Sequence, residues 1–185
     1  DPFLYQVEVS LLHNGEILDQ VIQPLGLRFY RIDPDEGFFL NGEHLPLRGV
    51  CRHQDRSEIG NALHPEHHEE DAALMLEMGV NAVRLAHYPQ NEYTVRLAEK
   101  MGFILWQEIP VWQGIDFTNN NTRKKAQRML SEMIKRDQNR CAVGYWGIAN
   151  ETQPSKARNE FLTSLLETGK QLDTTRLYVA AFDLV

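Results

Sequence analysis

The chain of 185 residues has few cysteines, no excess of basic residues and no long apolar run. Each of its two cysteines lies in or beside an apolar segment, so we expect Cys51 and Cys141 to be reduced thiols in the core. Acidic residues outnumber basic ones, 26 to 19, which argues against nucleic acid because phosphate binding needs a basic surface. No apolar run approaches the roughly 20 residues of a membrane-spanning helix. We therefore expect neither nucleic acid nor a membrane as a partner.

Further absences limit the fold. A complete (β/α)8 barrel takes about 250 residues, so this chain can hold only part of one. It also contains no G-x-G-x-x-G after its first candidate βα strand and no Walker loop, which counts against a nucleotide-binding open sheet. Neither an initiator methionine nor a signal peptide is present at the start, so we expect a piece of a longer protein. Cytoplasmic, periplasmic and secreted locations all stay open for that parent.

The first part of the chain has the pattern of β-strands. Apolar and polar residues alternate over residues 5–10 and again over 27–32, which is the period of a half-buried strand. Asn-Gly pairs at 14–15 and 41–42 are typical of hairpin turns. A few strands alone make a poor core. We therefore predict that residues 1–33 are the last strands of a β-sandwich and that residues 34–185 belong to a second domain.

Strand and helix patterns alternate in the second part. Pro65 suits the first turn of a helix, Asn91 and Ser155 are good N-caps, and Gly102 can end a helix. This alternation predicts a parallel sheet of five strands with four helices and right-handed crossovers, either as an open doubly wound sheet or as part of a (β/α)8 TIM barrel. The predicted strands cover residues 47–51, 81–88, 103–106, 143–149 and 177–182, and the helices begin near residues 65, 91, 122 and 155.

Polar, ionisable or aromatic residues follow four consecutive predicted strands. In a barrel, catalytic groups come from the C-terminal ends of the strands and from the loops after them. A polar loop explains one such run, but four runs directly after apolar segments indicate a site. The runs are Arg52-His53-Gln54-Asp55, His87-Tyr88-Pro89, Gln107-Glu108-Ile109-Pro110 with Trp112 beyond, and Asn150-Glu151-Thr152.

Glu151 is the strongest candidate for an acid. It follows the apolar residues 146–149, where a buried strand is predicted to meet a loop. A carboxylic acid beside aromatic residues at a barrel mouth can stay protonated through desolvation and donate a proton to a glycosidic oxygen. A surface glutamate that precedes a helix accounts for the same position, so both interpretations stay open.

Three histidines, His64, His67 and His68, lie close together around Pro65 and among glutamates. Such a group can suggest a metal site. A solvated polar turn at the start of a helix is the better account, because the surrounding residues are charged and the group opens a helix. We expect no metal and no cofactor.

Three segments resemble signatures of glycoside hydrolase family 2. Residues 81–89 read NAVRLAHYP and resemble the family signature N-x-x-R-x-x-H-Y-P. Residues 137–151 begin with DQNR, end with NE and resemble the second signature, which contains the acid/base glutamate. Residues 48–53, RGVCRH, are similar to the first barrel strand. The order and spacing agree, and the leading β segment resembles the end of the immunoglobulin-like domain that precedes the family's barrel.

The resemblance implies a retaining exo-β-glycosidase that acts by double displacement through a glycosyl-enzyme intermediate. Carried over by position, Glu151 is the general acid/base and Asn150 binds the 2-hydroxyl of the sugar. Arg84 lies beside the nucleophile and favours its ionised form. Trp112 either stacks on a sugar face or belongs to the core. The other residues expected to line the sugar subsite are His53, His87 and Glu108.

The family's nucleophile is a glutamate near the end of the seventh barrel strand, which falls beyond this chain. Retaining chemistry needs two carboxyl groups about 5–5.5 Å apart. We therefore expect the isolated chain to be inactive, and its unpaired strand edges to cause self-association. The Glu-x-His pair that binds magnesium in some β-galactosidases is absent after Glu108.

Several substrates and one other class of function stay open. The resemblance favours β-galactosides as the substrates. β-Glucuronides and β-mannosides stay open as alternatives, because the residues that choose between these sugars lie in the missing half. The alternative of another class is a non-catalytic carbohydrate-binding or assembly fragment. A second catalytic carboxylate would distinguish the two classes.

Overall fold

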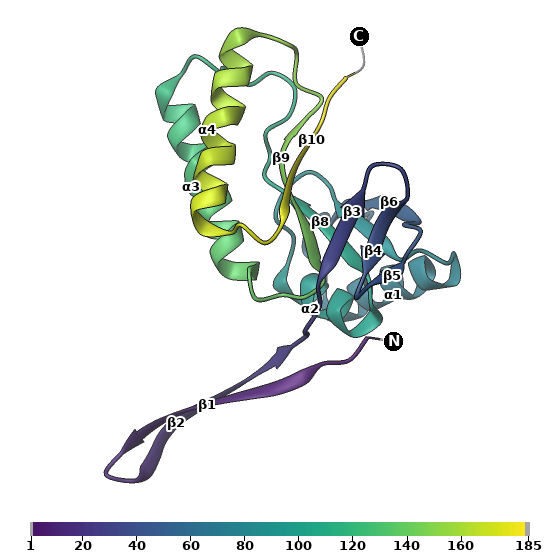
Figure 1. Ribbon diagram of the computed structural model, residues 1–185, viewed down its shortest axis with the longest axis vertical. Helices are drawn as coiled ribbons and strands as arrows, with labels where there is room; N and C mark the ends of the chain where they lie inside the picture. The colour runs from purple at the N-terminus through teal and green to yellow at the C-terminus, as the bar shows by residue number, and fades with distance from the viewer. Residues whose placement is uncertain (1, 184–185) are drawn as a thin grey trace.

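A computed structural model describes residues 2–183, in which a five-stranded parallel sheet follows an antiparallel hairpin and a small three-stranded sheet (Figure 1). The strands are β1 Tyr5–His13, β2 Glu16–Leu25, β3 Tyr30–Asp33, β4 Gly37–Leu40, β5 Glu43–His44, β6 Gly49–Arg52, β7 Ala82–Leu85, β8 Ile104–Glu108, β9 Val143–Asn150 and β10 Leu177–Ala181. The helices are α1 Pro65–Glu77, α2 Glu92–Met101, α3 Asn120–Asp137 and α4 Lys156–Leu172.

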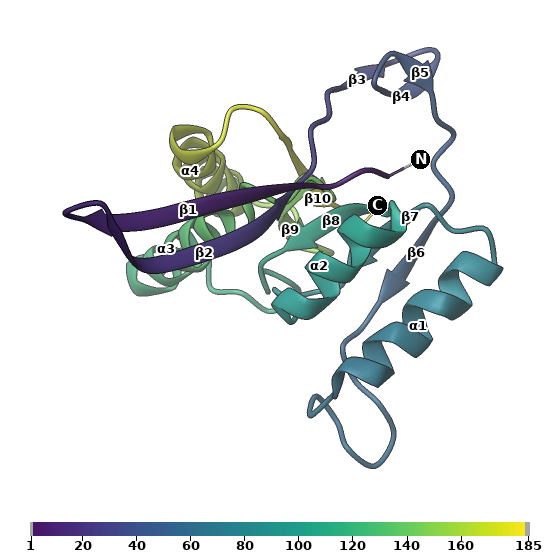
Figure 2. The ribbon, with the colours of Figure 1, turned by 90° about the horizontal axis from the view of Figure 1, so that it is seen from below.

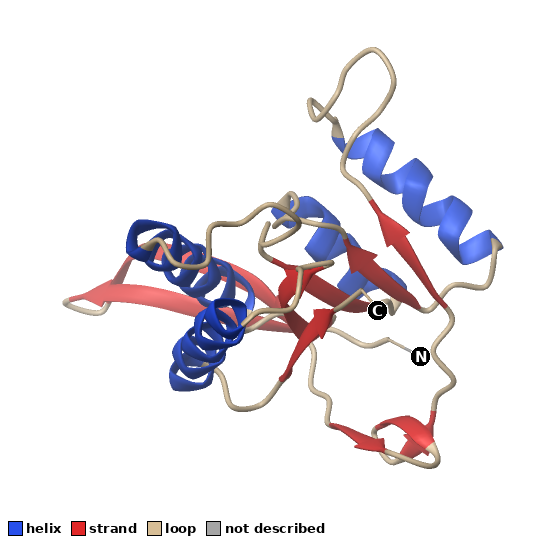
Figure 3. Cartoon of the chain, turned by 90° about the horizontal axis from the view of Figure 1, so that it is seen from above, coloured by secondary structure: helices blue, strands red, loops and turns tan. Residues whose placement is uncertain are grey.

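The parallel sheet runs in the order β6-β7-β8-β9-β10, and a helix follows each of the first four strands. All four neighbouring pairs are parallel. Seen from above, the helices lie on one side of the row of strands (Figure 3). In the view from below, α3 and α4 lie together near β9, and α1 lies beside β6 (Figure 2). This confirms the predicted fold class, a partial (β/α)8 TIM barrel.

The helix ends follow local signals in the sequence. Asn91 and Ser155 accept hydrogen bonds from backbone N–H groups in the first turns of α2 and α4, as predicted. Gly102 ends α2 with φ of +79°, a conformation that glycine adopts without strain. Helix α3 begins at Asn120, two residues earlier than expected, because Asn119 rather than a later residue caps it. No helix within residues 2–183 is long and apolar enough to cross a membrane.

The core lies between the sheet and the helices. Side chains that alternate along the strands face this core, while their neighbours face the barrel interior. Along β8, Leu105 and Gln107 face the helices, whereas Trp106 and Glu108 face the interior with Arg84 of β7. The core side chains that are at most 1% exposed include Leu85, Val95, Leu105, Leu130, Ile134, Val143, Trp146, Phe161 and Leu165.

The start of β3 and the residues just before it are tied to the N-terminal ends of the parallel strands. Arg28 donates to the carbonyls of Cys141, at 2.8 Å, and Val143, and the hydroxyl of Tyr30 donates to the carbonyl of Gly144 at 2.8 Å. Burial raises the pKa of the Cys141 thiol to about 11, so the thiol stays protonated at neutral pH. These contacts hold the N-terminal segment against the end of the barrel that lies opposite the candidate site.

Three expectations about the strands need correction or stay open. Cys51 is exposed rather than in the core, because β6 is an edge strand with one neighbour among the described residues. Strand β7 ends at Leu85 and not near residue 88, because the chain turns after Ala86. The hairpin of β1 and β2 projects from the barrel, whereas β3 pairs with β4 in a separate sheet (Figure 1). The domain division at residue 33 stays a prediction.

Candidate active site

The C-terminal ends of β6 to β9 bring together side chains from positions far apart in the sequence. The rings of His53 and His87 lie 5.2 Å apart between centroids, and the rings of His87 and Trp112 lie 6.2 Å apart. The predicted site residues that the structure gathers here are His53, Arg84, His87, Glu108, Trp112 and Asn150.

A buried ion pair forms the centre of this cluster. Glu108 is 1% exposed, and its carboxylate accepts from Nε of Arg84 at 2.9 Å and from Nη2 at 3.1 Å. Nδ1 of His87 lies 2.5 Å from Oε1 of the same carboxylate. The guanidinium of Arg84 also lies over the ring of Trp106, 4.5 Å from its centroid. Both carboxylate oxygens are therefore engaged, and Glu108 orients Arg84 and His87.

Asn150 is held from two sides at the end of β9. Its Oδ1 accepts from Nη2 of Arg84 at 2.7 Å, and its backbone N–H donates to the carbonyl of Val111 at 2.8 Å. Since arginine is only a donor, the amide oxygen must face Arg84. Its Nδ2 is buried and has no hydrogen-bond partner within residues 2–183. A buried donor without a partner is costly, so this amide is suited to a ligand hydroxyl.

Trp112 is not a core residue. It is 44% exposed and follows β8, while its neighbour Val111 is buried. The core interpretation of Trp112 is therefore wrong, and its ring is accessible beside His87. A half-exposed indole at the rim of a polar cluster offers an apolar face for stacking.

Glu151 differs from the rest of the predicted set. Its side chain is exposed and makes no hydrogen bond or ion pair with the part of the chain that the structure describes. Its backbone has φ of +47° and its N–H donates to the carbonyl of Ala181 in β10 at 2.9 Å. Glu151 lines a groove of about 500 Å³ together with residues of the loops after β8 and β9, among them Gln113, Ile115, Phe117 and Gln153.

Gly147 of β9 leaves the space that the central ion pair occupies. A Cβ atom at this position would overlap Cβ of Glu108 and Nε1 of Trp106, and would lie 3.0 Å from Oε2 of Glu108. A glycine is thus required for the close approach of β9 to these two side chains.

We expect Gly147→Ala to lower the free energy of unfolding of the full-length protein by about 1–3 kcal/mol, because overpacking displaces Glu108 and Trp106. Urea titration followed by tryptophan fluorescence measures this change. Gly114→Ala is the matched control, since a Cβ there meets nothing within 4 Å. An unchanged unfolding midpoint for Gly147→Ala would contradict the packing argument.

Tyr145 of β9 lines the interior face of the sheet together with Arg84 and Trp106. Its ring centroid lies 6.5 Å from that of Trp106. Burial raises the pKa of Tyr145 to about 12, so its hydroxyl stays neutral at all physiological pH values.

The group of three histidines does not form one solvated turn. His64 and His67 lie at the start of α1, where the N–H of His64 donates to Nδ1 of His67 at 3.0 Å. His68 is 2% exposed, so the expectation of a solvated side chain was wrong for this residue. It faces α2, where its Nδ1 lies 3.0 Å from Oγ1 of Thr94. Within residues 2–183, no three His, Cys, Asp or Glu side chains are grouped as a metal site requires.

The sequence patterns missed the polar side chains behind the cluster. Gln90 and Gln107 are at most 1% exposed, and Gln107 donates to Asp137 of α3 at 2.9 Å. Gln90 directly follows the predicted run His87-Tyr88-Pro89, and Gln107 begins the predicted run Gln107-Glu108-Ile109-Pro110, but neither was predicted to hold other side chains in place. Burial of a polar residue after a strand is not visible in a pattern of apolar residues.

The comparisons with known proteins identify the family. Residues 32–182 match the family model of the TIM barrel domain of glycosyl hydrolases family 2. The chain therefore belongs to glycosyl hydrolases family 2, as the resemblance of its signatures implied.

Relatives of the chain are named both as β-glucuronidases and as β-galactosidases. The chain is 50% identical over 183 residues to a β-glucuronidase of Bacteroides fragilis, in a match that covers 95% of this chain and 26% of the relative. It is 35% identical over 176 residues to a β-galactosidase of Thermoanaerobacter pseudethanolicus, covering 95% of this chain and 23% of the relative.

A solved structure of a β-glucuronidase also matches the chain closely. Bacteroides uniformis β-glucuronidase 2, covalently bound to cyclophellitol-6-carboxylate aziridine, superposes with a TM-score of 0.91 at 35% identity. The match covers 98% of this chain and 24% of that one. The chain thus spans about a quarter of the length of these relatives.

Proposed function

We propose that the protein to which this chain belongs is a retaining exo-β-glycosidase, with Glu151 as general acid/base. The observation that carries this proposal is the hydrogen-bonded cluster of Arg84, His87, Glu108 and Asn150, which ends directly before Glu151. Four parallel strands contribute to one edge of the sheet, where barrel enzymes hold their catalytic groups.

The chemistry assigns each of these residues a task. Glu151 protonates the glycosidic oxygen while a carboxylate from the rest of the protein attacks the anomeric carbon and forms a glycosyl-enzyme. The Glu151 carboxylate then takes a proton from the water that releases the sugar. Its exposed side chain in a groove leaves room for a leaving group and for that water.

The cluster supplies the sugar subsite. Nδ2 of Asn150 donates to a sugar hydroxyl, since Arg84 occupies the amide oxygen. Nε2 of His87 faces the substrate because Glu108 holds Nδ1. Trp112 and His53 border the subsite, Trp112 with an exposed ring face. Arg84 acts from below, by fixing Asn150 and by placing a positive charge beside the nucleophile.

β-Glucuronides are the first substrate class to test. The relative that is 50% identical is named a β-glucuronidase, and the solved relative is a β-glucuronidase covalently bound to a 6-carboxylate aziridine. β-Galactosides, which the sequence analysis favoured, are the second class, since a 35% identical relative is named a β-galactosidase.

We expect the full-length protein to hydrolyse 4-nitrophenyl β-D-glucuronide or 4-nitrophenyl β-D-galactoside with retention of the β configuration. Release of 4-nitrophenol gives the rate, and proton NMR of the first product gives the anomer. The isolated 185-residue chain is the control and should be inactive, because its nucleophile is predicted to lie outside it.

Two results would contradict the proposal. An α-configured first product would exclude double displacement. The 4-nitrophenyl β-D-mannoside is tested in the same way. If the protein binds these glycosides but hydrolyses none of them, a non-catalytic carbohydrate-binding protein is favoured.

A further inference from the structure

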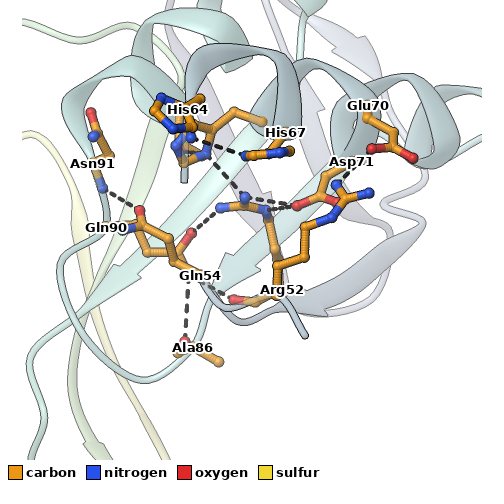
Figure 4. Close-up of polar contacts among 12 residues, drawn as sticks. Arg52, Gln54, His64, His67, Glu70, Asp71, Ala86, Gln90 and Asn91 are labelled. Carbon is orange, nitrogen blue, oxygen red and sulfur yellow. Dashed lines mark hydrogen bonds and ion pairs between the residues drawn. The ribbon is translucent and has the colours of Figure 1, made fainter. Parts of the chain in front are cut away.

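The buried side chain of Gln90 is hydrogen-bonded to the turn that carries His87 and to the end of β6. Gln90 is 1% exposed, and its Nε2 donates to the carbonyls of Arg52, at 2.7 Å, and Ala86, at 3.4 Å. Its Oε1 accepts from Nη1 of Arg52 at 2.6 Å. Figure 4 shows this amide between the end of β6 and the turn after β7. One side chain thus joins the two strand ends that precede His53 and His87.

Arg52 is itself fixed from behind. It is 6% exposed, and its Nε and Nη2 donate to Oδ2 of Asp71 in α1 at 2.9 and 2.7 Å (Figure 4). Its Nη2 also lies 3.0 Å from Nδ1 of His68. Since arginine can only donate, Nδ1 of His68 accepts. Burial, and next the charge of Arg52, lower the pKa of His68, so its ring stays neutral and keeps this acceptor at neutral pH.

Further bonds hold the same turn from two other directions. Oε1 of Gln54, in the loop after β6, accepts from the N–H of Asn91 at 2.6 Å, and the N–H of Gln54 donates to the hydroxyl of Tyr88 at 3.0 Å. From α3, Nη1 of Arg136 donates to the carbonyl of Gln90 at 3.1 Å. The turn is therefore bound to β6, to the loop that follows β6, and to α3.

These hydrogen bonds fix the backbone next to His53 and His87, the two histidines of the proposed sugar subsite. His53 directly follows Arg52, and His87 directly follows Ala86, whose carbonyl Gln90 binds. The two histidine rings are 5.2 Å apart, and His87 must meet Oε1 of Glu108 with its Nδ1 in order to present Nε2 outward. A shift of the turn would break that contact.

We propose that Gln90 and Arg52 are positioning residues, which set His53 and His87 in the sugar subsite without touching the substrate. Both side chains are buried on the helix side of the strand ends, so they act only through the residues they hold. The proposal rests on the proposed function, because it assigns the two histidines to sugar binding.

The test is a double-mutant cycle in the full-length protein with the better of the two aryl glycosides. We expect Gln90→Met to lower kcat/KM about tenfold, because misplaced groups lose much of their effect. In a background that carries both His53→Ala and His87→Ala, the same change should lower kcat/KM less than about twofold, since the two residues through which Gln90 acts are gone. If Gln90 only supported the fold, its replacement would lower kcat/KM by the same factor in both backgrounds.

Two further variants complete the design. Gln127→Met is the matched control, because Gln127 also donates from a partly buried amide, to Thr168 of α4 at 3.1 Å, and should leave kcat/KM unchanged. Gln90→Glu keeps an acceptor for Arg52 but places a carboxylate oxygen against the carbonyls of Arg52 and Ala86, so it should also lower kcat/KM when both histidines are present. It replaces Gln90→Met if that variant does not fold.

Equal losses in the two backgrounds, or parent kinetics for Gln90→Met, would overturn the proposal. If the full-length protein hydrolyses no aryl glycoside, the proposed function fails, and a crystal structure of the Gln90→Met variant decides the positioning claim. Separation of His87 Nδ1 from Glu108 Oε1 beyond hydrogen-bond distance supports it. An unchanged contact rejects it.

Discussion

Replacing Glu151 with alanine in the full-length protein is expected to lower kcat by about 10²–10⁴-fold on glycosides with poor leaving groups, because the proton donor is lost. Aryl glycosides with good leaving groups need little protonation, so their first step should survive better. Release of the sugar also loses its general base, and the glycosyl-enzyme should accumulate. Burst kinetics with an activated aryl glycoside measure this accumulation.

Azide should rescue the variant. The vacated space admits a small anion that needs no deprotonation, and it attacks the glycosyl-enzyme from the face that water uses. The expected product is a β-configured glycosyl azide, identified by NMR. Glu160→Ala is the matched control, because it removes an exposed carboxylate from nearby α4. Disaccharide hydrolysis within a few-fold of the parent rate, or an α-configured azide, would show that Glu151 is not the acid/base.

Replacing Arg84 with methionine is expected to cost about 3–5 kcal/mol of folding free energy, because it leaves the carboxylate of Glu108 buried without its charge partner. The same change removes the donor that holds Asn150, so kcat/KM should fall by at least about tenfold. Urea titration and aryl glycoside kinetics of the full-length protein give the two quantities.

A second substitution separates charge from packing. In the double variant Arg84→Met/Glu108→Gln, the buried charge is gone, so part of the lost stability should return while activity stays low. Arg128→Met is the control, since Arg128 is largely exposed and pairs with Glu132 on the surface of α3. If Glu108→Gln gives no recovery of stability, the buried ion pair is not the reason for the loss.

The helices, the parallel strands and their order follow from local signals in the sequence. The caps at Asn91 and Ser155 and the glycine stop at Gly102 were predicted correctly, because each satisfies backbone groups within a few residues of itself. The alternation of strands and helices predicted the parallel sheet, since right-handed crossovers leave few arrangements. The strand ends likewise predicted which segments would meet at one edge.

The burial of individual side chains and the partners they bind depend on how the elements pack in the folded chain. Cys51 lies in an apolar run and yet is exposed, because burial depends on the neighbours of β6. His68 lies among charged residues and yet is buried, because α2 packs against that face of α1. A local pattern does not contain such partners, which come from distant parts of the chain.

The polar network shows the same limit most clearly. Glu108 and Arg84 are 24 positions apart, and Gln90 and Arg52 are 38 apart. Each pair forms because two strand ends meet. Its hydrogen bonds become strong only after the assembled sheet has excluded water, and they then offset the cost of burying the two polar groups. The strand pattern therefore predicted the edge of the sheet at which the polar cluster of Arg84, His87, Glu108 and Asn150 lies. The packing of α1, α2 and α3 against that edge decided which polar groups hold it in place.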